Sequence, residues 1–383
     1  MLTKTNGGPN GSPTPAQTAA KQAPAVRAID FTRASLEHSE PAFDESNTLT
    51  TGQQTIGPFD VPAFGFLRSI WLRVIMSGSA AGMATVAENP DAPWNVIASI
   101  ALRDVNGANL VGPFTGYDLF LVNKWGGYDY DDDPTRGPAY TAPDSDGDFE
   151  FALRVPCEIV ARNAYGALLN QNAGATYKVD ITLAADDTIY STSPDTLGTV
   201  RVKGFLEAWT PPSAADPVGN PQAQRPPGLG TTQYWSKYSP ATSVGSNQIR
   251  LQRVGHFIRT LILVLRDDNN AREGADINEA VNLRVVLDGF DVINLDPVLV
   301  RQRMAELYGY DLAAITTADL DEGVYVLPFS HDFDGKPGGE LGHFWLPTAQ
   351  STRLEVVLTT LNTAGTLDVI TNDLAPVAVS SVA

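Results

Sequence analysis

An internal repeat is the feature of this 383-residue sequence that most restricts its fold. Residues 66–72 (FLRSIWL) and 257–263 (FIRTLIL) are both apolar runs typical of a β-strand, and each has an arginine at its third position, Arg68 or Arg259. A chain that repeats one pattern of elements over the length of a domain is expected to fold as two similar units. The repeat therefore predicts a duplicated domain.

A pair of hairpins follows these strands in the same order. Asn106-Gly107 and Asp288-Gly289 each lie between two β-rich runs, and each dipeptide suits a two-residue type I′ turn, which needs positive φ at both central residues. Gly107 precedes Tyr128 by as many residues as Gly289 precedes Tyr310. The sequence thus predicts two equivalent hairpins.

One helix is expected after each hairpin. Pro113 and Pro297 suit the first helical position, and Gly127 and Gly309 suit the left-handed residue that ends a helix. In the first copy we expect residues 114–125 to be helical, with one apolar side packed on the barrel. In the second copy Asp296 can cap the helix. The residues expected along one side of that second helix are Val300, Met304, Leu307 and Tyr308.

A further pair of matching segments closes each copy. Residues 178–183 (KVDITL) resemble residues 353–358 (RLEVVL), and residues 197–200 (LGTV) resemble residues 364–367 (AGTL). Coincidence is the alternative explanation, because any two β domains share strand-like hexamers. The common order of hairpin, helix and closing strands favours duplication.

The composition indicates an all-β fold. The chain has 33 Gly and 27 Pro, which bound many short apolar runs. Its net charge of −18 argues against broad binding to nucleic-acid phosphates, since such binding depends on Lys and Arg side chains that displace counterions. No run approaches the roughly 18 apolar residues of a membrane span, and the N-terminus lacks an apolar signal core. We therefore expect the chain to be made and folded in a cytoplasm.

Four segments are expected along the chain: a flexible N-terminal arm at 1–45, a first domain at 46–210, a Pro-rich connection at 211–246 and a second domain at 247–383. The arm is rich in small and polar residues and cannot offset its own ordering entropy. It is either a soluble tail or an arm that docks on a neighbouring subunit or an anionic surface. Its candidate contact residues are Lys4, Lys21, Arg27 and Arg33.

Three aromatic residues in the Pro-rich connection, Tyr234, Trp235 and Tyr238, make it too apolar for a free linker. Aromatic rings bury a large area at little cost in side-chain entropy and are favoured at interfaces. We expect these residues to anchor the connection to a domain or to a partner subunit, and so to fix the orientation of the two domains.

The sequence has no pattern typical of a catalytic or cofactor site. It contains no GxSxG, P-loop or dinucleotide motif, and its single cysteine, Cys157, lies in an apolar run where a buried structural thiol is expected. Alternating carboxylates at 129–150 can supply ligands to Ca²⁺ but lack the EF-hand pattern, and the HDFDG segment at 331–335 suits a turn. We predict no catalytic, cofactor-binding or metal-binding residue. The histidines, which form no metal-binding motif, are His38, His256, His331 and His343.

Three segments of the first copy resemble the first domain of tectivirus-type major capsid proteins. They are APWNVI at 92–97, IALRDVNG at 100–107 and GYDLFLVN at 116–123. In that family a β-hairpin is followed by a helix that bears an aromatic residue and a similar ending, in a chain of comparable length that starts with a flexible arm. The resemblance covers the plan of nearly the whole chain.

The resemblance implies two eight-stranded jelly rolls side by side, each with a short helix after a hairpin, in a homotrimer that forms a nearly hexagonal tile of an icosahedral shell. It also implies a virion location and contacts with neighbouring trimers, penton and minor capsid proteins. The arm is then expected to face the internal membrane of a bacteriophage, with no direct contact to nucleic acid. Two alternatives stay open: a carbohydrate- or receptor-binding β-sandwich such as a viral spike, and a jelly-roll enzyme.

Overall fold

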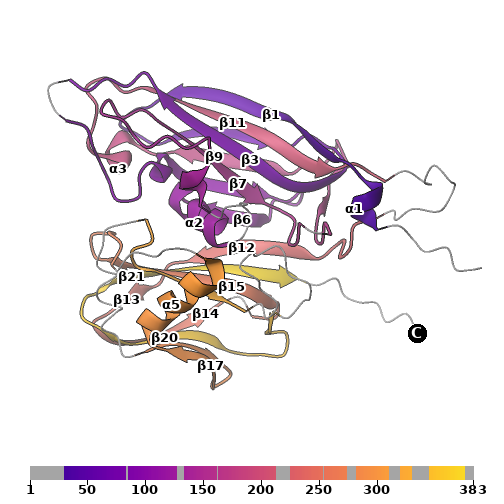
Figure 1. Ribbon diagram of the computed structural model, residues 1–383, viewed down its shortest axis with the longest axis vertical. Helices are drawn as coiled ribbons and strands as arrows, with labels where there is room; N and C mark the ends of the chain where they lie inside the picture. The colour runs from indigo at the N-terminus through magenta and orange to yellow at the C-terminus, as the bar shows by residue number, and fades with distance from the viewer. Residues whose placement is uncertain are drawn as a thin grey trace, which may run out of the picture.

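The fold consists of two barrels, one above the other in Figure 1, with the N-terminal half of the chain in the upper barrel. The computed structural model describes residues 30–82, 85–126, 133–161, 163–212, 225–252, 254–273, 282–309, 320–329 and 345–375. Within these ranges the chain is mostly β-strand, and no helix is long and apolar enough to cross a membrane.

The first barrel has two sheets. One has the strand order β1-β11-β3-β7, with the short β8 also paired to β3, and the other has the order β2-β9-β5-β6. The strands of the first sheet are β1 (Glu37–Thr48), β3 (Phe66–Ser77), β7 (Phe149–Pro156), β8 (Leu168–Leu169) and β11 (Thr199–Trp209). Those of the second sheet are β2 (Gln54–Asp60), β5 (Ile97–Arg103), β6 (Asn109–Phe114) and β9 (Lys178–Leu183).

Shorter elements connect these strands. Two of them, β4 and β10, pair with each other. The shorter elements are α1 (Phe31–Ala34), β4 (Ala87–Glu88), α2 (Gly116–Gly126), α3 (Asp186–Ile189) and β10 (Tyr190–Thr192), with 3₁₀ turns at Trp94–Val96 and Pro134–Arg136.

The second barrel also has two sheets, in the orders β12-β21-β15-β18 and β14-β20-β16-β17. The strands of the first of these are β12 (Thr232–Tyr238), β15 (Phe257–Asp267), β18 (Val324–Pro328) and β21 (Gly365–Ala375). Those of the other are β14 (Gly245–Leu251), β16 (Leu283–Leu287), β17 (Phe290–Leu295) and β20 (Leu354–Leu361). The remaining elements are β13 (Ala241–Thr242), β19 (Leu346–Pro347) and helix α5 (Pro297–Tyr308).

The two barrels share one topology. When the eight main described strands of each barrel are counted in chain order, one sheet of each barrel has the order 1-8-3-6 and the other has the order 2-7-4-5. This is the arrangement of an eight-stranded jelly roll. The predicted fold, two jelly rolls side by side with a helix after one hairpin of each, is confirmed.

The segments matched in the sequence occupy equivalent strands. Residues 66–72 and 257–263 lie in the third strands, β3 and β15, and the two predicted hairpins join the fourth and fifth strands of each barrel. Residues 178–183 and most of residues 353–358 lie in the seventh strands, β9 and β20. The repeat in the sequence is therefore a repeat in structure.

Arg68 and Arg259 occupy the same irregularity in the two barrels. The register between β3 and β11 shifts at Arg68, and the register between β15 and β21 shifts at Arg259. At each β-bulge the arginine carbonyl accepts a backbone hydrogen bond from just beyond the sixth strand, from the Glu158 N–H at 2.8 Å and from the Phe329 N–H at 2.9 Å. The repeated arginine thus marks a conformational feature that both barrels share.

The two hairpin turns differ. Asp288 and Gly289 have φ of 48° and 87° and leave Leu287 paired with Phe290, so the predicted type I′ turn is confirmed there. The same prediction for Asn106-Gly107 is wrong, because φ is positive at Gly107 (83°) and not at Asn106. Asp104 and Ala108 close a three-residue loop through the Asp104 N–H and the Ala108 carbonyl at 2.8 Å. The Asp104 carboxylate stabilises this wider loop by accepting from the Val105 N–H at 2.7 Å.

Helix α5 begins and ends as predicted. Pro297 is at its first position, the Asp296 carboxylate accepts from the Val298 N–H at 2.8 Å, and Gly309 ends the helix with φ of 70°. Val300, Met304 and Tyr308 are buried, and Leu307 packs partly buried beside them.

The predicted start of the first helix is wrong. Pro113 lies in β6, and α2 begins only at Gly116. The local reason is a capping box: the Thr115 hydroxyl accepts from the Asp118 N–H at 3.1 Å, and the Asp118 carboxylate accepts from the Thr115 N–H at 2.9 Å. Gly127, the predicted end, lies outside the described residues.

Two expected segment boundaries also need correction. Residues 37–48 form β1, which pairs along its length with β11, so the first barrel begins inside the segment expected to be an arm. Residues 232–238 form β12, the first strand of the second barrel, although they were expected in the connection. β1 is polar along nearly its whole length and none of its residues is buried, so its sequence lacks the alternation of apolar and polar residues that is typical of a strand.

Candidate functional site: the seam between the two barrels

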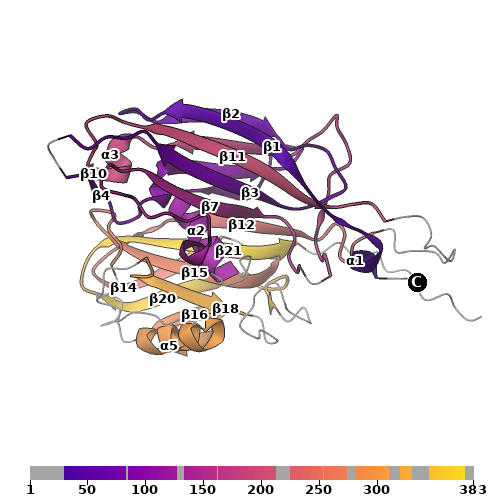
Figure 2. The same cartoon turned by 45° about the horizontal axis from the view of Figure 1, so that its top comes forward.

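Helix α2 lies between the two barrels, as Figure 2 shows, and every one of its eleven residues is buried. It contacts β5 and β7 of its own barrel and β15 of the second barrel. A helix that is covered on all sides carries apolar residues all round, which accounts for the sequence YDLFLV in its first half. We call α2 and the residues that join it to the second barrel the seam.

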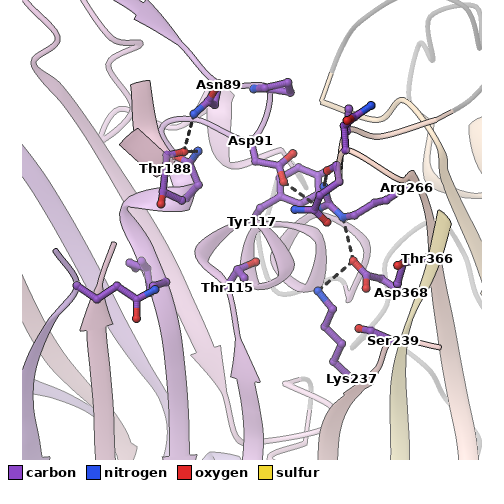
Figure 3. Close-up of a pocket in the computed structure, with 18 residues that line it drawn as sticks. Asn89, Asp91, Thr115, Tyr117, Thr188, Lys237, Ser239, Arg266, Thr366 and Asp368 are labelled. Atoms are coloured by element: carbon purple, nitrogen blue, oxygen red, sulfur yellow. Dashed lines mark hydrogen bonds and ion pairs between the residues drawn. The ribbon is translucent and has the colours of Figure 1, made fainter. Parts of the chain in front are cut away.

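Alternating charges from both barrels meet at the N-terminal end of α2 (Figure 3). The Lys237 Nζ atom of β12 lies 3.0 Å from Asp368 Oδ2 of β21, an ion pair drawn in Figure 3. The same atom lies 2.9 Å from Asp118 Oδ1 of α2. Asp118 is almost fully buried, so its charge depends on this cation.

The row of charges continues away from Lys237. The Arg266 Nε atom lies 2.9 Å from Asp368 Oδ2, and its Nη2 atom lies 2.9 Å from Asp91 Oδ2. The Arg272 Nε atom then lies 2.9 Å from Asp91 Oδ1. Asp91 comes from the first barrel and both arginines come from the second, so the row crosses the seam. It borders a cavity of about 650 Å³.

The pKa values of Lys237 and Asp368 agree with ionised side chains at the centre of this row. Burial alone would lower the pKa of Lys237, but the Asp118 and Asp368 carboxylates outweigh it and raise that pKa above its usual value. Burial alone would raise the pKa of Asp368, yet Lys237, Ser239 and Arg266 together hold that pKa below its usual value. The charges therefore compensate one another at neutral pH.

The first turn of α2 makes further contacts with the second barrel, and the far end of α2 is held by it as well. The Tyr117 ring lies 5.5 Å from the Arg266 guanidinium and 5.0 Å from that of Arg272, and the Tyr117 hydroxyl donates to the Leu320 carbonyl at 2.6 Å. At the other end, the Tyr308 hydroxyl of α5 donates to the Trp125 carbonyl at 3.1 Å. Contacts at both ends of α2 fix the relative orientation of the barrels.

The backbone joins the barrels as well. Trp235 of β12 pairs with Asn372 of β21 on one side and, in parallel, with Val111 of β6 on the other. One ten-stranded sheet therefore runs from the first barrel into the second.

The three aromatic residues predicted as anchors do not lie on one surface. Trp235 is fully buried at the seam, whereas Tyr234 stacks on His256 with ring centroids 5.9 Å apart. Tyr238 is 38 % exposed. Their roles as interface residues stay a prediction, and the geometry separates Trp235 from the other two. Of the predicted arm contacts, Arg33 lies in α1, while Lys4, Lys21 and Arg27 lie outside the described residues.

The residues considered above as possible nucleophiles or metal ligands have surroundings that are typical of residues with a structural role. Cys157 is buried, and burial raises the pKa of its thiol far above the usual value. The Asp148 carboxylate accepts from the Gly78 and Ser79 N–H groups at 2.9 and 2.8 Å. In the described ranges no group of three or more His, Cys, Asp or Glu side chains could hold a metal ion. Residues 127–132 and 331–335, with His331 and His343, lie outside those ranges.

The charged residues of the seam were not singled out in the sequence. They are Asp91, Asp118, Lys237, Arg266, Arg272 and Asp368. One signal was present, since Arg266 ends the long apolar run of β15 and Asp368 interrupts the apolar run of β21. A charge inside an otherwise buried strand requires a partner.

Comparison of the sequence with known proteins gives no relative: no family model matches the chain, and no curated protein matches it. Solved structures do match. A structure of Sulfolobus Turreted Icosahedral Virus has a TM-score of 0.58 at 11% identity, over 89% of this chain and 91% of that chain. The PBCV-1 virus capsid gives 0.56 at 11% identity, over 91% and 94%, and the Faustovirus major capsid protein gives 0.53 at 10% identity, over 89% and 90%. The likeness spans nearly the full length of both chains, and it shows that this chain has the double jelly-roll fold of those capsid structures.

Proposed function

We propose that this chain is a major capsid protein, a structural subunit that forms homotrimers which tile an icosahedral viral shell. The observation that carries the proposal is the seam: two equivalent barrels are held in a fixed orientation by a fully buried helix and a row of compensated charges. Full-length likeness to capsid structures supports it.

A fixed orientation is what such a tile needs. Three copies of a chain with two similar barrels supply six similar units, and these can close into a nearly hexagonal ring only if the angle within each pair is constant. A flexible joint would leave the ring undefined. The charges of the seam neutralise one another, which suits a structural joint better than an active site, so we propose no catalytic activity.

The wider setting of the proposal is a membrane-containing bacteriophage. The subunit is made in the host cytoplasm and functions in the virion, with neighbouring trimers, penton and minor capsid proteins as partners. The slightly basic segment before α1 faces the internal membrane, and the acidic remainder makes no direct contact with nucleic acid. In this proposal the first jelly roll ends near residue 210 and the second begins with β12.

The test is the assembly state of the purified chain. Light scattering after size-exclusion chromatography is expected to give three times the 41.0 kDa chain mass, and negative-stain micrographs are expected to show hexagonal outlines. A chain that stays monomeric at high concentration, and that binds glycans on an array, would instead support the receptor-binding alternative.

A further inference from the structure

Helix α2 is covered by the second barrel, whereas the equivalent surface of the second helix, α5, is partly exposed in the described part of the chain. Helix α5 follows the β16–β17 hairpin as α2 follows the β5–β6 hairpin, so the two helices have equivalent places. The first turn of α2 is buried, whereas the first turn of α5 exposes Val298 (47 %) and Leu299 (55 %). Apolar residues exposed at the equivalent of a buried contact indicate a surface that another molecule covers.

A matching surface exists on the sheet side. Side chains of Lys237, Asp368 and Ile370 share the face of the second barrel that meets α2, because residues alternate across a strand and Lys237 pairs with Ile370. Ile370 pairs with Ile262 on the same face, and both are fully buried.

The first barrel carries the same positions uncovered. The equivalent β-bulges at Arg68 and Arg259 align the two barrels residue by residue. This alignment places the cross-strand pair Trp71 and Phe205 where the second barrel has Ile262 and Ile370. Trp71 and Phe205 are only half-buried, on the outer face of the sheet β1-β11-β3-β7.

The charged residues that join α2 to the second barrel have apolar residues at the equivalent positions, both on the helix and on the sheet. Asp118 is the third residue after the capping Thr115, and the third residue after the capping Asp296 is Leu299. Lys237 pairs with Ile370 in the second barrel, and the residue that pairs with Phe205 in the first barrel is Pro41. An ion pair within the chain is thus replaced by an apolar residue on each of the two uncovered surfaces.

We propose that α5 of one copy packs on the outer face of β1-β11-β3-β7 of a second copy, as α2 packs on β12-β21-β15-β18 within the chain. This inference rests on the proposed function and names the surface that closes the trimer. The sheet lies at the top of the molecule in Figure 1 and α5 lies in the lower barrel, as it does in Figure 2. Two different surfaces on opposite sides give a head-to-tail contact, which closes into a ring when the rotation is one third of a turn.

The first test introduces one charge into each surface. Leu299→Lys changes the helix side and Phe205→Lys changes the sheet side; Pro41→Lys is a second, exposed change on the sheet side. The matched control is Val244→Lys, because Val244 is 66 % exposed and adjoins β14, at the opposite edge of the sheet from β17. Light scattering and a thermal unfolding scan are recorded for each variant and for the unmodified chain.

We expect the control and the unmodified chain to have three times the chain mass. Leu299→Lys and Pro41→Lys are expected to have the mass of one chain and still to unfold in a cooperative thermal transition, with a midpoint no higher than that of the trimer. Trimers that persist in both of these variants would overturn the inference and leave the proposed function standing. An unmodified chain that is monomeric at every concentration would overturn both.

Mixing supplies the second test. Leu299→Lys keeps an intact sheet surface and Pro41→Lys keeps an intact helix, so an equimolar mixture is expected to form a heterodimer of twice the chain mass and nothing larger. A mixture that stays monomeric, or that forms complete trimers, would contradict a head-to-tail contact between these two surfaces.

Discussion

Lys237 holds two carboxylates at once, one from each barrel. Replacing it by Met removes the cation beside the buried Asp118 carboxylate, and an uncompensated buried charge costs about 3–5 kcal/mol. We expect Lys237→Met to lower the free energy of unfolding by an amount in that range, measured by urea denaturation. Lys178→Met, which removes an exposed cation, is the control and is expected to change little. Equal stability of the two variants would show that the seam does not depend on its charges.

Trp235 and Tyr238 lie three residues apart and are expected to respond differently to truncation. Trp235→Ala removes a fully buried ring where β6, β12 and β21 meet, and such a change costs about 3–5 kcal/mol. Tyr238→Ala removes a partly exposed ring and is expected to cost about 1 kcal/mol or less within the single chain. Chemical denaturation of both variants checks this. A large loss for Tyr238→Ala would instead show that Tyr238 is an anchor within the single chain.

At the scale of single elements, α5 offers a test of local capping. Asp296→Ala removes the side-chain acceptor for the Val298 N–H and is expected to cost about 1 kcal/mol, whereas Asp296→Ser retains a capping oxygen and is expected to cost much less. Denaturation curves for the two variants give the difference. If Ser and Ala were equally destabilising, the cap would not contribute to the stability of the second barrel.

Elements with a strong local signal could be predicted from the sequence. Asp288-Gly289 and Asp296-Pro297 form the turn and the cap that their residue types favour. The start of α2 is harder to predict, because two local signals compete: Pro113 suits a first helical position, and Thr115 and Asp118 have the spacing of a capping box. The pairing of Phe114 in β6 with Ile100 in β5 favours the second signal. β1 is an edge strand with one face in solvent, so its polar sequence carried little strand signal.

The seam was beyond sequence reasoning for a different reason. Lys237 meets Asp118 across 119 positions of sequence, and Arg272 meets Asp91 across 181. Neither pairing has a local pattern. The repeat in the sequence indicates that the two barrels are equivalent, but it carries no information about which of their faces meet.

At the scale of the whole molecule, acid is expected to weaken the joint between the barrels. The pKa of Asp368 in the folded chain lies below its usual value, so its ionisation contributes stability that is fully present above the usual value of about 4 and is lost as the pH falls through the folded pKa. Thermal scans from neutral to strongly acidic pH should show a falling midpoint in that window. The Asp368→Asn variant should show a flatter profile there, and an identical profile would contradict this assignment.

The folded pKa of Lys237 is raised, and the consequence has the opposite sign. Its contribution is fully present below the usual value for lysine and is lost only as the pH rises through the folded pKa. Neutral solutions therefore lie inside the range in which both groups stabilise the seam.

Shortening the chain from its N-terminus is expected to have two distinct effects. Removal of residues 1–29 should leave the thermal transition intact and reduce binding to anionic lipid vesicles. That segment is slightly basic, which suits contact with an anionic surface, and it has too few large apolar residues to form part of a core. Removal of residues 1–36 also deletes Phe31, whose ring lies 5.4 Å from that of Phe66 and 6.1 Å from that of Trp209. This longer deletion should lower the transition temperature. Loss of cooperative unfolding in the shorter deletion would make those residues part of the fold.

The seam also determines the order in which such an assembly can come apart. Its two sides belong to one covalent chain, so they meet at a local concentration that does not change when the solution is diluted. Contacts between separate copies have no such protection, since their occupancy falls with protein concentration. Dilution can therefore dissociate copies from one another while each pair of barrels stays joined, and the smallest unit that an assembling shell exchanges with its surroundings is a preformed pair of barrels.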